Sequence, residues 1–398
     1  MEKYIINVRI IDKNRDEFAD VAIKDGKISG IGDFKDRDNV TDGKNLVLMP
    51  AFVDLHVHFR DPGFTYKEDL KSGSLSALKG GYTAVNLMGN TKPVCDNMDI
   101  YSDIMKRGKE LDLVDINQVI AVTENLEGKI LTDMDNFDKS VKYLSDDGKG
   151  VVSTKVMYNA LIKAKKNNLG IMVHAEDMDI SSFDYRAAED VMTIRDVYLA
   201  KITGAHVHFS HVSTADSLKA IIQGKQEGVN VTCEVTPHHI SLFDMDYKVH
   251  PPIRSRKDVE YLIQGIKDGY VDAIATDHAP HTAEEKAKGS PGLVGLETAF
   301  CVSYTSLVRN NGLNLKDLSK VMSFNGAKLL KLNKGLIEVG YDADLVLLDL
   351  DKKIKVNADE FVSKSKNTPF NDKEFFGEVV WTMKSGNIKY QRREINAD

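Results

Sequence analysis

A pair of histidines in an otherwise apolar segment constrains this chain more than any other feature. The segment is PAFVDLHVHFRDPG (50–63), and it contains His56 and His58. It reads as a buried strand, in which residues i and i+2 point to the same face, so the two imidazoles converge. Converging imidazoles on a rigid backbone begin a metal site, although two histidines packed in a core or a loop are the alternative. Arg60 and Asp61 follow where the strand should end, which is where barrel and open α/β enzymes place their chemistry.

The histidines are unevenly distributed along the chain. All 11 lie between His56 and His281, and neither the first 55 residues nor the last 117 contain one. Histidines with purely structural roles would be expected to reach the flanks as well. The distribution therefore predicts a central domain that binds metal or performs acid–base chemistry, with flanking segments that do not.

Charge and cysteine content limit the partners and the compartment. The 398 residues are long enough for one large core and a smaller domain. The net charge is −7 and no basic block is present, which argues against nucleic acid as a partner. The N-terminal stretch is interrupted by charges, so we expect no signal peptide and no membrane span. Three widely spaced cysteines favour a cytoplasmic protein without a disulfide framework. They are Cys95, Cys233 and Cys301.

The centre of the chain alternates between strand-like and helix-like segments. The expected strands are VDLHVHF (53–59), TAVNLM (83–88), INQVIAV (116–122), KYLSDD (142–147), IMVHAE (171–176), HVHFSHV (206–212), NVTCEVT (230–236) and AIATDH (273–278). Between most of them, apolar residues recur at intervals of three or four, and several of these stretches stop at glycine, as helices do. Eight such alternations predict an α/β fold, a (β/α)8 TIM-type barrel. A doubly wound open sheet is the alternative, but no strand is followed by a nucleotide-binding glycine motif.

Both ends of the chain read as short strands separated by turns. Residues 1–48 and the tail after 334 are rich in Ile and Val between turn residues such as Asp25-Gly26. Because chain termini often lie close together, the two ends are expected to form one domain. We predict a small β-sandwich from 1–48 plus 335–398, and a catalytic barrel over 49–334.

Polar residues recur where the predicted barrel strands end. The series is His56 and His58 on the first strand, Asp147 after the fourth, His174 on the fifth, His211 on the sixth and Asp277 on the eighth. Buried charges need a metal or a counter-ion, and four imidazoles with two carboxylates could surround two divalent metals. Mixed nitrogen and oxygen donors suit zinc best, with manganese or cobalt as substitutes. Taken singly, each residue could equally be structural, and that is how we interpret His206, His208, His238 and His239.

The same residues lie in motifs that resemble the amidohydrolase superfamily, and more closely the dihydroorotases of pyrimidine biosynthesis. The motifs are DLHVHFRDPG (54–63), MGNTKPVCDN (88–97), SDDG (145–148), HAED (174–177), HVST (211–214), VTPHH (235–239), ATDHAPH (275–281) and GLET (295–298). The resemblance runs nearly end to end. HFRDPG followed by N-T-K-P is specific to dihydroorotases and their close relatives, whereas H-x-H alone marks only the superfamily.

The resemblance implies a zinc enzyme with up to two metals per chain. One metal would be held by His56, His58, Asp147 and Asp277, and the other by Asp147, His174 and His211. Asp147 would take the place that a carboxylated lysine has in many relatives. The substrate contacts implied are His58, Arg60, Asn90, His250, His281, Pro291 and Gly292.

The implied reaction is the reversible conversion of dihydroorotate to N-carbamoyl-aspartate. A metal-bound hydroxide would attack the ring amide carbonyl. Asp277 would take its proton and pass it to the leaving ring nitrogen. Arg60 would bind the substrate carboxylate bidentately, as lysine cannot. The resemblance further implies a homodimer that acts on a small molecule in the cytoplasm.

This chain departs from the usual dihydroorotase pattern at four places. Gly89 replaces a proline, His250 replaces an asparagine that contacts the pyrimidine, and Pro291-Gly292 replaces Phe-Gly. The segment between His174 and His211 is also short. These changes affect ring recognition and leave the implied metal ligands in place. The alternatives are another cyclic-amide hydrolase, such as a hydantoinase or allantoinase, and a non-catalytic dihydroorotase-like scaffold.

Overall fold

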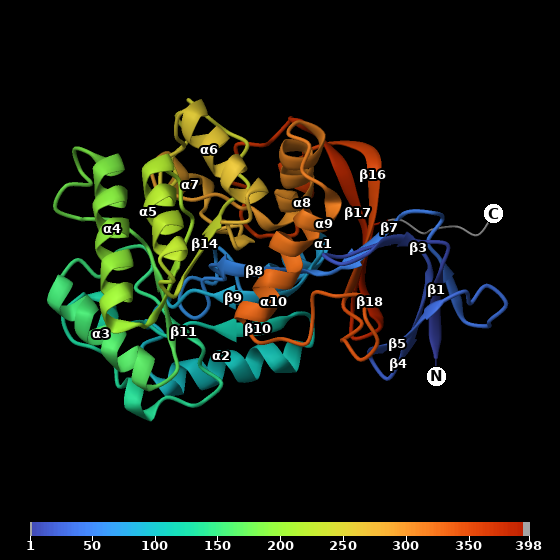
Figure 1. Ribbon diagram of the computed structural model, residues 1–398, viewed down its shortest axis with the longest axis horizontal. Coiled ribbons are helices and arrows are strands. Elements are labelled where there is room, and N and C mark those ends of the chain that lie inside the picture. Colours follow the sequence, from blue (N-terminus) through green and yellow to red (C-terminus); the bar gives the residue numbers. More distant parts are fainter. Residues whose placement is uncertain (1, 393–398) are drawn as a thin grey trace.

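A computed structural model describes residues 2–392 and contains a barrel of eight parallel strands (Figure 1). The strands are β8 (Phe52–Val57), β9 (Tyr82–Leu87), β10 (Asp115–Gln118), β11 (Tyr143–Leu144), β12 (Gly170–Val173), β13 (His206–Phe209), β14 (Val231–Val235) and β15 (Ala273–Ile274). They pair in parallel as β10-β9-β8 and as β11 to β15 in order. Parallel bridges from Ile120 to Leu144 and from Val57 to His278 join the two sheets at both edges. The predicted barrel is therefore confirmed, and the open-sheet alternative is excluded.

Six long helices surround the barrel, and each begins at a side chain that caps its first turn. The helices are α1 (Leu70–Lys79), α2 (Met98–Leu111), α3 (Thr154–Lys166), α4 (Tyr185–Thr203), α5 (Ala215–Gln226) and α6 (Arg256–Lys267). The caps are Asp69, Asn97, Ser153, Asp184, Thr214 and Ser255, whose side chains accept backbone N–H groups. Within the described residues, the connection from β10 to β11 contains only the short turns η1 (Glu124–Leu126) and η2 (Met134–Asn136) in place of an α-helix.

Short helical segments follow β15, and the last of them covers one end of the barrel. They are α7 (Ala283–Ala287), η3 (Leu296–Thr298), α8 (Ala299–Ser303), η4 (Tyr304–Arg309), α9 (Leu315–Ser319), η5 (Lys320–Phe324) and α10 (Asn325–Leu329). Ala327 of α10 and the adjacent Leu330 pack against Val53 and Leu55 inside the barrel. This packing places an apolar cluster inside the barrel toward the N-terminal end of the strands.

The strands at the two ends of the chain form a β-sandwich beside the barrel, on the right of Figure 1. One sheet has the order β5-β4-β1-β6 and the other β18-β17-β16-β7-β2-β3. Their bounds are β1 (Lys3–Ile6), β2 (Arg9–Ile11), β3 (Asp16–Phe18), β4 (Asp20–Lys24), β5 (Lys27–Gly32), β6 (Val40–Asp42), β7 (Val47–Pro50), β16 (Leu345–Lys355), β17 (Glu374–Lys384) and β18 (Asn387–Gln391). Ile23, Leu48 and Trp381 share one buried cluster between the sheets.

The two ends of the chain thus meet in one sheet, as the Ile- and Val-rich patterns suggested. In the tail, residues 345–355 form one long strand, β16, with an irregular register between Asp349 and Lys353. The exact bounds of the two domains stay a prediction, and residues 393–398 of the smaller one lie outside the described residues. The segment between β16 and β17, which includes η6 (Ala358–Glu360), also reaches the barrel, where Ser363 Oγ donates to Glu68 at 2.5 Å.

Candidate metal and substrate site

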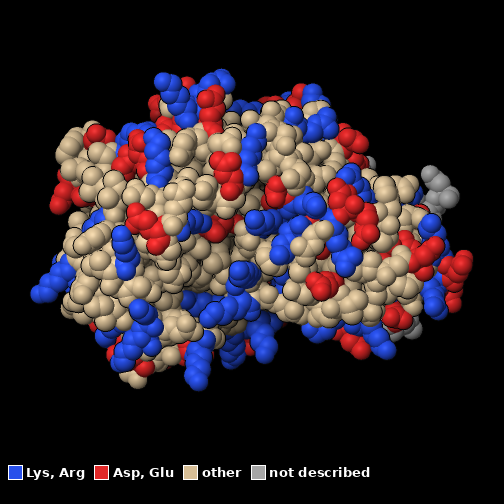
Figure 2. All heavy atoms as spheres, in the orientation of Figure 1, with Lys and Arg blue, Asp and Glu red and all other residues tan. Residues whose placement is uncertain are grey.

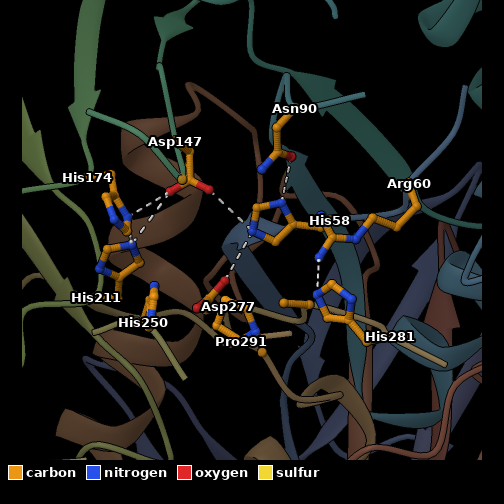
Figure 3. Close-up of a pocket in the computed structure, with 13 residues that line it drawn as sticks. His58, Arg60, Asn90, Asp147, His174, His211, His250, Asp277, His281 and Pro291 are labelled. Atoms are coloured by element: carbon orange, nitrogen blue, oxygen red, sulfur yellow. Dashed lines mark hydrogen bonds and ion pairs between the residues drawn. The ribbon is translucent and has the colours of Figure 1, made fainter. Parts of the chain in front are cut away.

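A cavity of about 170 Å³ opens at the C-terminal end of the barrel strands (Figure 3). Its lining residues come from the segments that follow β8, β9, β11, β12, β13, β14 and β15. They are His58, Arg60, Asn90, Asp147, Gly148, His174, His211, His250, Asp277, Ala279, His281, Pro291 and Gly292. The structure therefore brings together every residue that the sequence assigned to the site except His56, which lies fully buried against the same carboxylates.

Two histidines from β8 converge with two aspartates on one side of the cavity. His56 Nε2 lies 3.3 Å from Asp147 Oδ1 and 3.6 Å from Asp277 Oδ1. His58 Nε2 lies 3.1 Å from Asp277 Oδ1 and 3.4 Å from Asp147 Oδ2. Both imidazoles thus present Nε2 to the same pair of carboxylates, as the i, i+2 spacing on a strand requires.

A second group of donors shares Asp147 with the first. His174 Nδ1 and His211 Nε2 each lie 3.5 Å from Asp147 Oδ1, and they lie 3.0 Å from each other. The donor atoms of His56, His58 and Asp147 lie within 4.8 Å of one another, and so do those of Asp147, His174 and His211. Figure 3 shows Asp147 between the two groups, with one oxygen toward His174 and His211 and the other toward His58.

The donor set fits two tetrahedrally coordinated divalent metals. Metal–nitrogen and metal–oxygen bonds of about 2.1 Å at tetrahedral angles separate neighbouring donors by roughly 3.4 Å, and the spacings here run from 3.0 to 3.6 Å. His56 Nε2 and Asp147 Oδ1 are also buried without a hydrogen-bond partner. Because buried polar atoms are normally satisfied, these two atoms are suited to bind a cation.

Three of the side chains around the cavity stand on left-handed backbone. Arg60 has φ 59°, His211 has φ 38° and Asp277 has φ 47°. Arginine and histidine rarely adopt this conformation, and it costs on the order of 1 kcal/mol or more unless the surroundings enforce it. Each residue follows the end of a barrel strand by two or three positions, so the abrupt turn directs its side chain over the barrel mouth.

The two aspartates are held in their charged form. Burial alone would raise the pKa of Asp147, but the neighbouring His56, His174 and His211 bring it well below its usual value. Burial alone would also raise the pKa of Asp277, but the hydrogen bond from His58 and the charges of His56, His58 and His211 together lower it. Two ionised carboxylates in a closed pocket provide the negative charge that a pair of divalent cations needs.

Most metal-facing histidines are oriented by a partner on the other ring nitrogen. His56 Nδ1 contacts Glu234 Oε1 at 3.1 Å, and His174 Nε2 contacts Glu176 Oε2 at 2.9 Å. Such partners fix which ring nitrogen is free to bind a metal. The sequence interpretation did not include Glu176 or Glu234. A charged residue inside the apolar strand VTCEV was the signal that could have identified Glu234.

Asn90, predicted to contact the substrate, has a second role in the structure. Its Oδ1 accepts from His58 Nδ1 at 2.8 Å, which leaves His58 Nε2 directed at the aspartates. Asn90 Nδ2 donates to no other part of the described chain and lies against the cavity. One amide therefore both orients a metal-facing histidine and offers a donor to a ligand.

The opposite wall of the cavity carries a cation with no carboxylate partner. Arg60 forms no ion pair within the described residues, and its buried Nε has no hydrogen-bond partner. Its Nη2 lies 3.4 Å from His281 Nε2. Burial and the Arg60 charge lower the pKa of His281 to about 4, so this imidazole is neutral at pH 7. His281 Nε2 therefore accepts from the guanidinium, and a guanidinium without a carboxylate partner is suited to bind an anionic ligand.

The rim of the cavity is held by backbone contacts. Gly292 has φ 132°, and a Cβ atom there would lie 2.8 Å from Ala279 Cβ, so glycine is required. Lys286 Nζ donates to the carbonyl oxygens of Ser290 and Gly292, which ties this loop to itself. His250 projects from another loop, and its ring centroid lies 5.0 Å from that of Tyr185. The structure places His250, Pro291 and Gly292 at the cavity, while their roles stay predictions.

Comparison with known proteins identifies relatives over the whole length. A profile of the amidohydrolase family matches residues 47–389. The dihydroorotase of Clostridium botulinum (strain Eklund 17B / Type B) is 56% identical over 398 residues, covering 98% of this chain and 100% of the relative. The dihydroorotase of Fusobacterium nucleatum subsp. nucleatum is 38% identical over 426 residues, covering 98% and 99%. Among solved structures, the L-hydantoinase (dihydropyrimidinase) from Arthrobacter aurescens matches with a TM-score of 0.91 at 27% identity, covering 100% and 98%.

Proposed function

This chain belongs to the amidohydrolase family, and we propose that it is a dihydroorotase, which interconverts (S)-dihydroorotate and N-carbamoyl-L-aspartate in de novo pyrimidine biosynthesis. The sequence relatives that share its full length support this activity. The observation that carries the proposal is the unpaired Arg60 guanidinium in the wall of the same cavity as the two donor groups. A cyclic amide that bears a carboxylate needs both.

The donor groups would hold two divalent metals. His56, His58, Asp147 and Asp277 are proposed to hold one, and Asp147, His174 and His211 the other. Zinc suits these donors best, with Mn²⁺ or Co²⁺ as substitutes. When bound, such metals would activate a water molecule near neutral pH and stabilise negative charge on the carbonyl oxygen.

The residues of the chain itself position the substrate and move the proton. Arg60, with Asn90 and His281 beside it, would bind the carboxylate and thereby place the ring carbonyl near Asp277. Asp277 is charged and can accept the proton of the attacking water at a carboxylate oxygen. It would then deliver that proton to the ring nitrogen as the carbon–nitrogen bond breaks. His250 and the backbone at Pro291 and Gly292 would contact the ring.

Each of the two alternative functions leaves a feature of this chain without a role. A hydantoinase or allantoinase acts on a neutral ring, so it has no use for an unpaired arginine in the wall of its cavity. A scaffold that has lost its catalysis would be expected to lack metal donors, whereas all six proposed donors meet here. The high structural similarity to a hydantoinase therefore describes the common fold.

Ring opening of dihydroorotate, followed by absorbance, tests the activity directly. We expect turnover in the metal-loaded protein, loss of turnover after removal of metal by a chelator, and its return on addition of zinc. Hydantoin and allantoin, tested at the same concentration, should be poor substrates. Equal or faster opening of either neutral ring would support the hydantoinase alternative, and a chain that binds no stoichiometric metal would support the scaffold.

We further propose a cytoplasmic enzyme that forms a homodimer through the outer face of α4. Within residues 2–392, none of the helices combines the length and apolar character that crossing a bilayer requires. Four apolar side chains along α4 and two on α3 are between 39% and 61% exposed. They are Val191, Ile194, Tyr198 and Ile202 on α4, and Tyr158 and Ile162 on α3. We call these six residues the α3–α4 patch.

The size of the α3–α4 patch favours a second copy of the chain as its partner. The six side chains expose roughly 500 Å² of apolar surface, a large part of the ~800 Å² that each partner contributes to a standard interface. Residues 191, 194, 198 and 202 recur at helical spacing, so they form one stripe. A twofold axis would place the stripe against its own copy, as in most homodimers. Figure 1 shows α4 on the flank away from the β-sandwich, where a second molecule can approach.

A further inference from the structure

A series of four hydrogen bonds, two buried and two partly buried, runs from His56 through the barrel interior. His56 Nδ1 contacts Glu234 Oε1 at 3.1 Å, and Glu234 Oε2 contacts His208 Nε2 at 3.0 Å. His208 Nδ1 contacts Thr232 Oγ1 at 2.8 Å, and the same hydroxyl contacts His206 Nε2 at 2.8 Å. These hydrogen bonds therefore link β8 to β14, and β14 to β13.

This series of hydrogen bonds ends at the opposite end of the barrel from the active site. His206 is the first residue of β13 and lines a second cavity of about 360 Å³, together with Lys142, Lys165 and Lys331. Figure 2 shows Lys and Arg side chains gathered at the lower centre of the molecule, over the region where Figure 1 places β11, α10 and α2. His208, which is buried, and His206, which is partly exposed, were interpreted from the sequence as structural, and the structure places both in one polar path.

When the histidines are neutral, only one arrangement of protons satisfies all the hydrogen bonds between His56 and His206. A ring nitrogen lies at hydrogen-bond distance from each Glu234 oxygen, His56 Nδ1 at 3.1 Å and His208 Nε2 at 3.0 Å, and both contacts are satisfied when the carboxylate accepts at both oxygens. His208 must therefore donate from Nε2 and accept at Nδ1 from the Thr232 hydroxyl. His206 Nε2–H then donates to Thr232 Oγ1. Every bond in the chain is directed toward Glu234, an arrangement in which neighbouring hydrogen bonds polarise one another.

This arrangement fixes the ring of His56. Its Nδ1–H donates to Glu234, so the lone pair on Nε2 faces Asp147 and Asp277. Glu234 is fully buried, and no lysine or arginine forms an ion pair with it within the described chain. Its negative charge therefore acts on His56 and on whatever cation His56 binds.

The second donor group has a matching arrangement. His174 presents Nδ1 to Asp147, and its Nε2 contacts Glu176 Oε2 at 2.9 Å. Tyr185 Oη donates to the same Glu176 oxygen at 2.8 Å. By contrast, His58 has only the neutral amide of Asn90 behind it. Each donor group thus contains one histidine that is oriented by a carboxylate.

We propose that Glu234, held by His208 and Thr232, is a positioning residue that orients His56 and selectively strengthens cation binding at the donor group of His56, His58, Asp147 and Asp277. Glu176 is its counterpart at the group of Asp147, His174 and His211. The inference rests on the metal site of the proposed function but not on the identity of the substrate, so metal affinity tests it without any turnover measurement.

Metal titration of the Glu234→Gln and Glu176→Gln variants tests the proposal. Apoprotein would be titrated with Zn²⁺ against a chelator and with Co²⁺ by visible absorbance. Removal of a carboxylate that orients a metal-binding histidine commonly weakens metal binding by about 10- to 100-fold. We expect Glu234→Gln to weaken one of the two metal equivalents by that factor and to leave the other at its wild-type affinity.

The two donor groups can be distinguished in a variant that retains only one of them. His211→Asn disables the second group. In that background, Glu234→Gln should still weaken the remaining metal, whereas Glu176→Gln should not. If both substitutions weakened the remaining metal equally, or neither did, the assignment of one carboxylate to each group would be wrong.

Two further measurements separate positioning from a general loss of structure. The thermal midpoint of apo Glu234→Gln should match that of the wild-type apoprotein, while the increase that Zn²⁺ produces should shrink. Equal loss of both metals together with a lower apo midpoint would overturn the proposal. If Glu234→Gln does not fold, Thr232→Val breaks the chain farther from the metal and should weaken the same equivalent by about 2- to 5-fold, with Thr232→Ser restoring it. Wild-type affinity in Thr232→Val would contradict the role of the chain.

Discussion

The proposed choice of substrate depends on the Arg60 guanidinium. It lies in the cavity wall without an ion-pair partner among residues 2–392, and Asn90 and His281 lie in the same cavity. We expect Arg60→Met to reduce kcat/KM for dihydroorotate by about 10²- to 10³-fold, because a charge-assisted bidentate contact of roughly 3–4 kcal/mol is lost. Metal content should not change, since no proposed metal donor is altered. Steady-state kinetics and metal analysis on the same preparation measure both effects.

Two variants control for the loss of a positive charge alone. Arg309 lies over the Phe376 ring at 4.2 Å and does not line the cavity, so Arg309→Met should keep wild-type kinetics. Arg60→Lys keeps the charge but loses the fork geometry, and its activity should fall between the two. Wild-type turnover by Arg60→Met would remove the main argument against a hydantoinase.

Individual site residues differ in how far the sequence could identify them. The histidines and aspartates of the two donor groups follow strand ends in chain order, so pattern and spacing were enough to predict that they meet. Glu176 and Glu234 act through a histidine, and no local rule links Glu234 in β14 to His56 in β8. Their contacts depend on the packing of side chains inside a closed barrel, which only coordinates supply.

At the scale of the elements, the Asp258 carboxylate links the three helices α4, α5 and α6. Asp258 in α6 accepts from Arg186 in α4 at 2.9 and 3.0 Å, and from the backbone N–H of Ala215 in α5 at 3.0 Å. It is 3% exposed. Burial alone would raise its pKa, but the Arg186 guanidinium and the Ala215 N–H lower it to about 2.

This lowered pKa predicts a pH-dependent contribution to stability. A carboxylate whose pKa falls on folding stabilises the protein fully above its unfolded pKa of about 4, and the contribution disappears as the pH falls toward 2. We expect Asp258→Asn to lower the free energy of unfolding by about 1–2 kcal/mol at pH 7. The difference from the wild type should narrow between pH 4 and pH 3. Urea unfolding at pH 7, 4 and 3 measures it.

The matched control uses the same arginine. Asp216 contacts Arg186 Nη2 at 3.0 Å, but its side chain is 51% exposed. Exposed ion pairs contribute little because water screens them, so Asp216→Asn should change the unfolding midpoint far less. A gap between Asp258→Asn and wild type that stays constant from pH 7 to pH 3 would show that the carboxylate is not ionised selectively in the folded state.

The sequence predicted the type and order of the barrel strands but not their lengths. All eight barrel strands occur where hydrophobic runs indicated them, yet the segments 142–147 and 273–278 contribute only two strand residues each. Asp147 and Asp277 therefore lie on loops beyond short strands, and the left-handed backbone of Asp277 directs its side chain inward. Hydrophobic periodicity does not report where hydrogen-bonded pairing stops, because that depends on the neighbouring strand. The residue pattern between β10 and β11 likewise did not show that a helix is missing.

At the scale of the whole molecule, the active site and the proposed dimer surface are separate. The residues that line the cavity and those of the α3–α4 patch have no member in common. The segment after β16 contacts the cavity from the same chain. Asn367 Nδ2 donates to the Gly292 carbonyl at 3.1 Å, and Asn367 Oδ1 accepts from the His281 N–H at 3.1 Å. Loss of the dimer should therefore affect stability more than turnover.

The α3–α4 patch leads to a test of the homodimer. We expect the wild-type chain to sediment as a dimer, and a double substitution, Ile194→Asp with Tyr198→Asp, to sediment as a monomer, because two unpaired carboxylates would be placed in an apolar interface. Ile130→Asp is the control, since Ile130 is 62% exposed on a loop outside the patch. The monomeric variant should keep its metal and most of its kcat, because the patch and the cavity have no residue in common. A double variant that remained dimeric would place the interface elsewhere, and a monomeric wild type would leave the patch without a second copy as its partner.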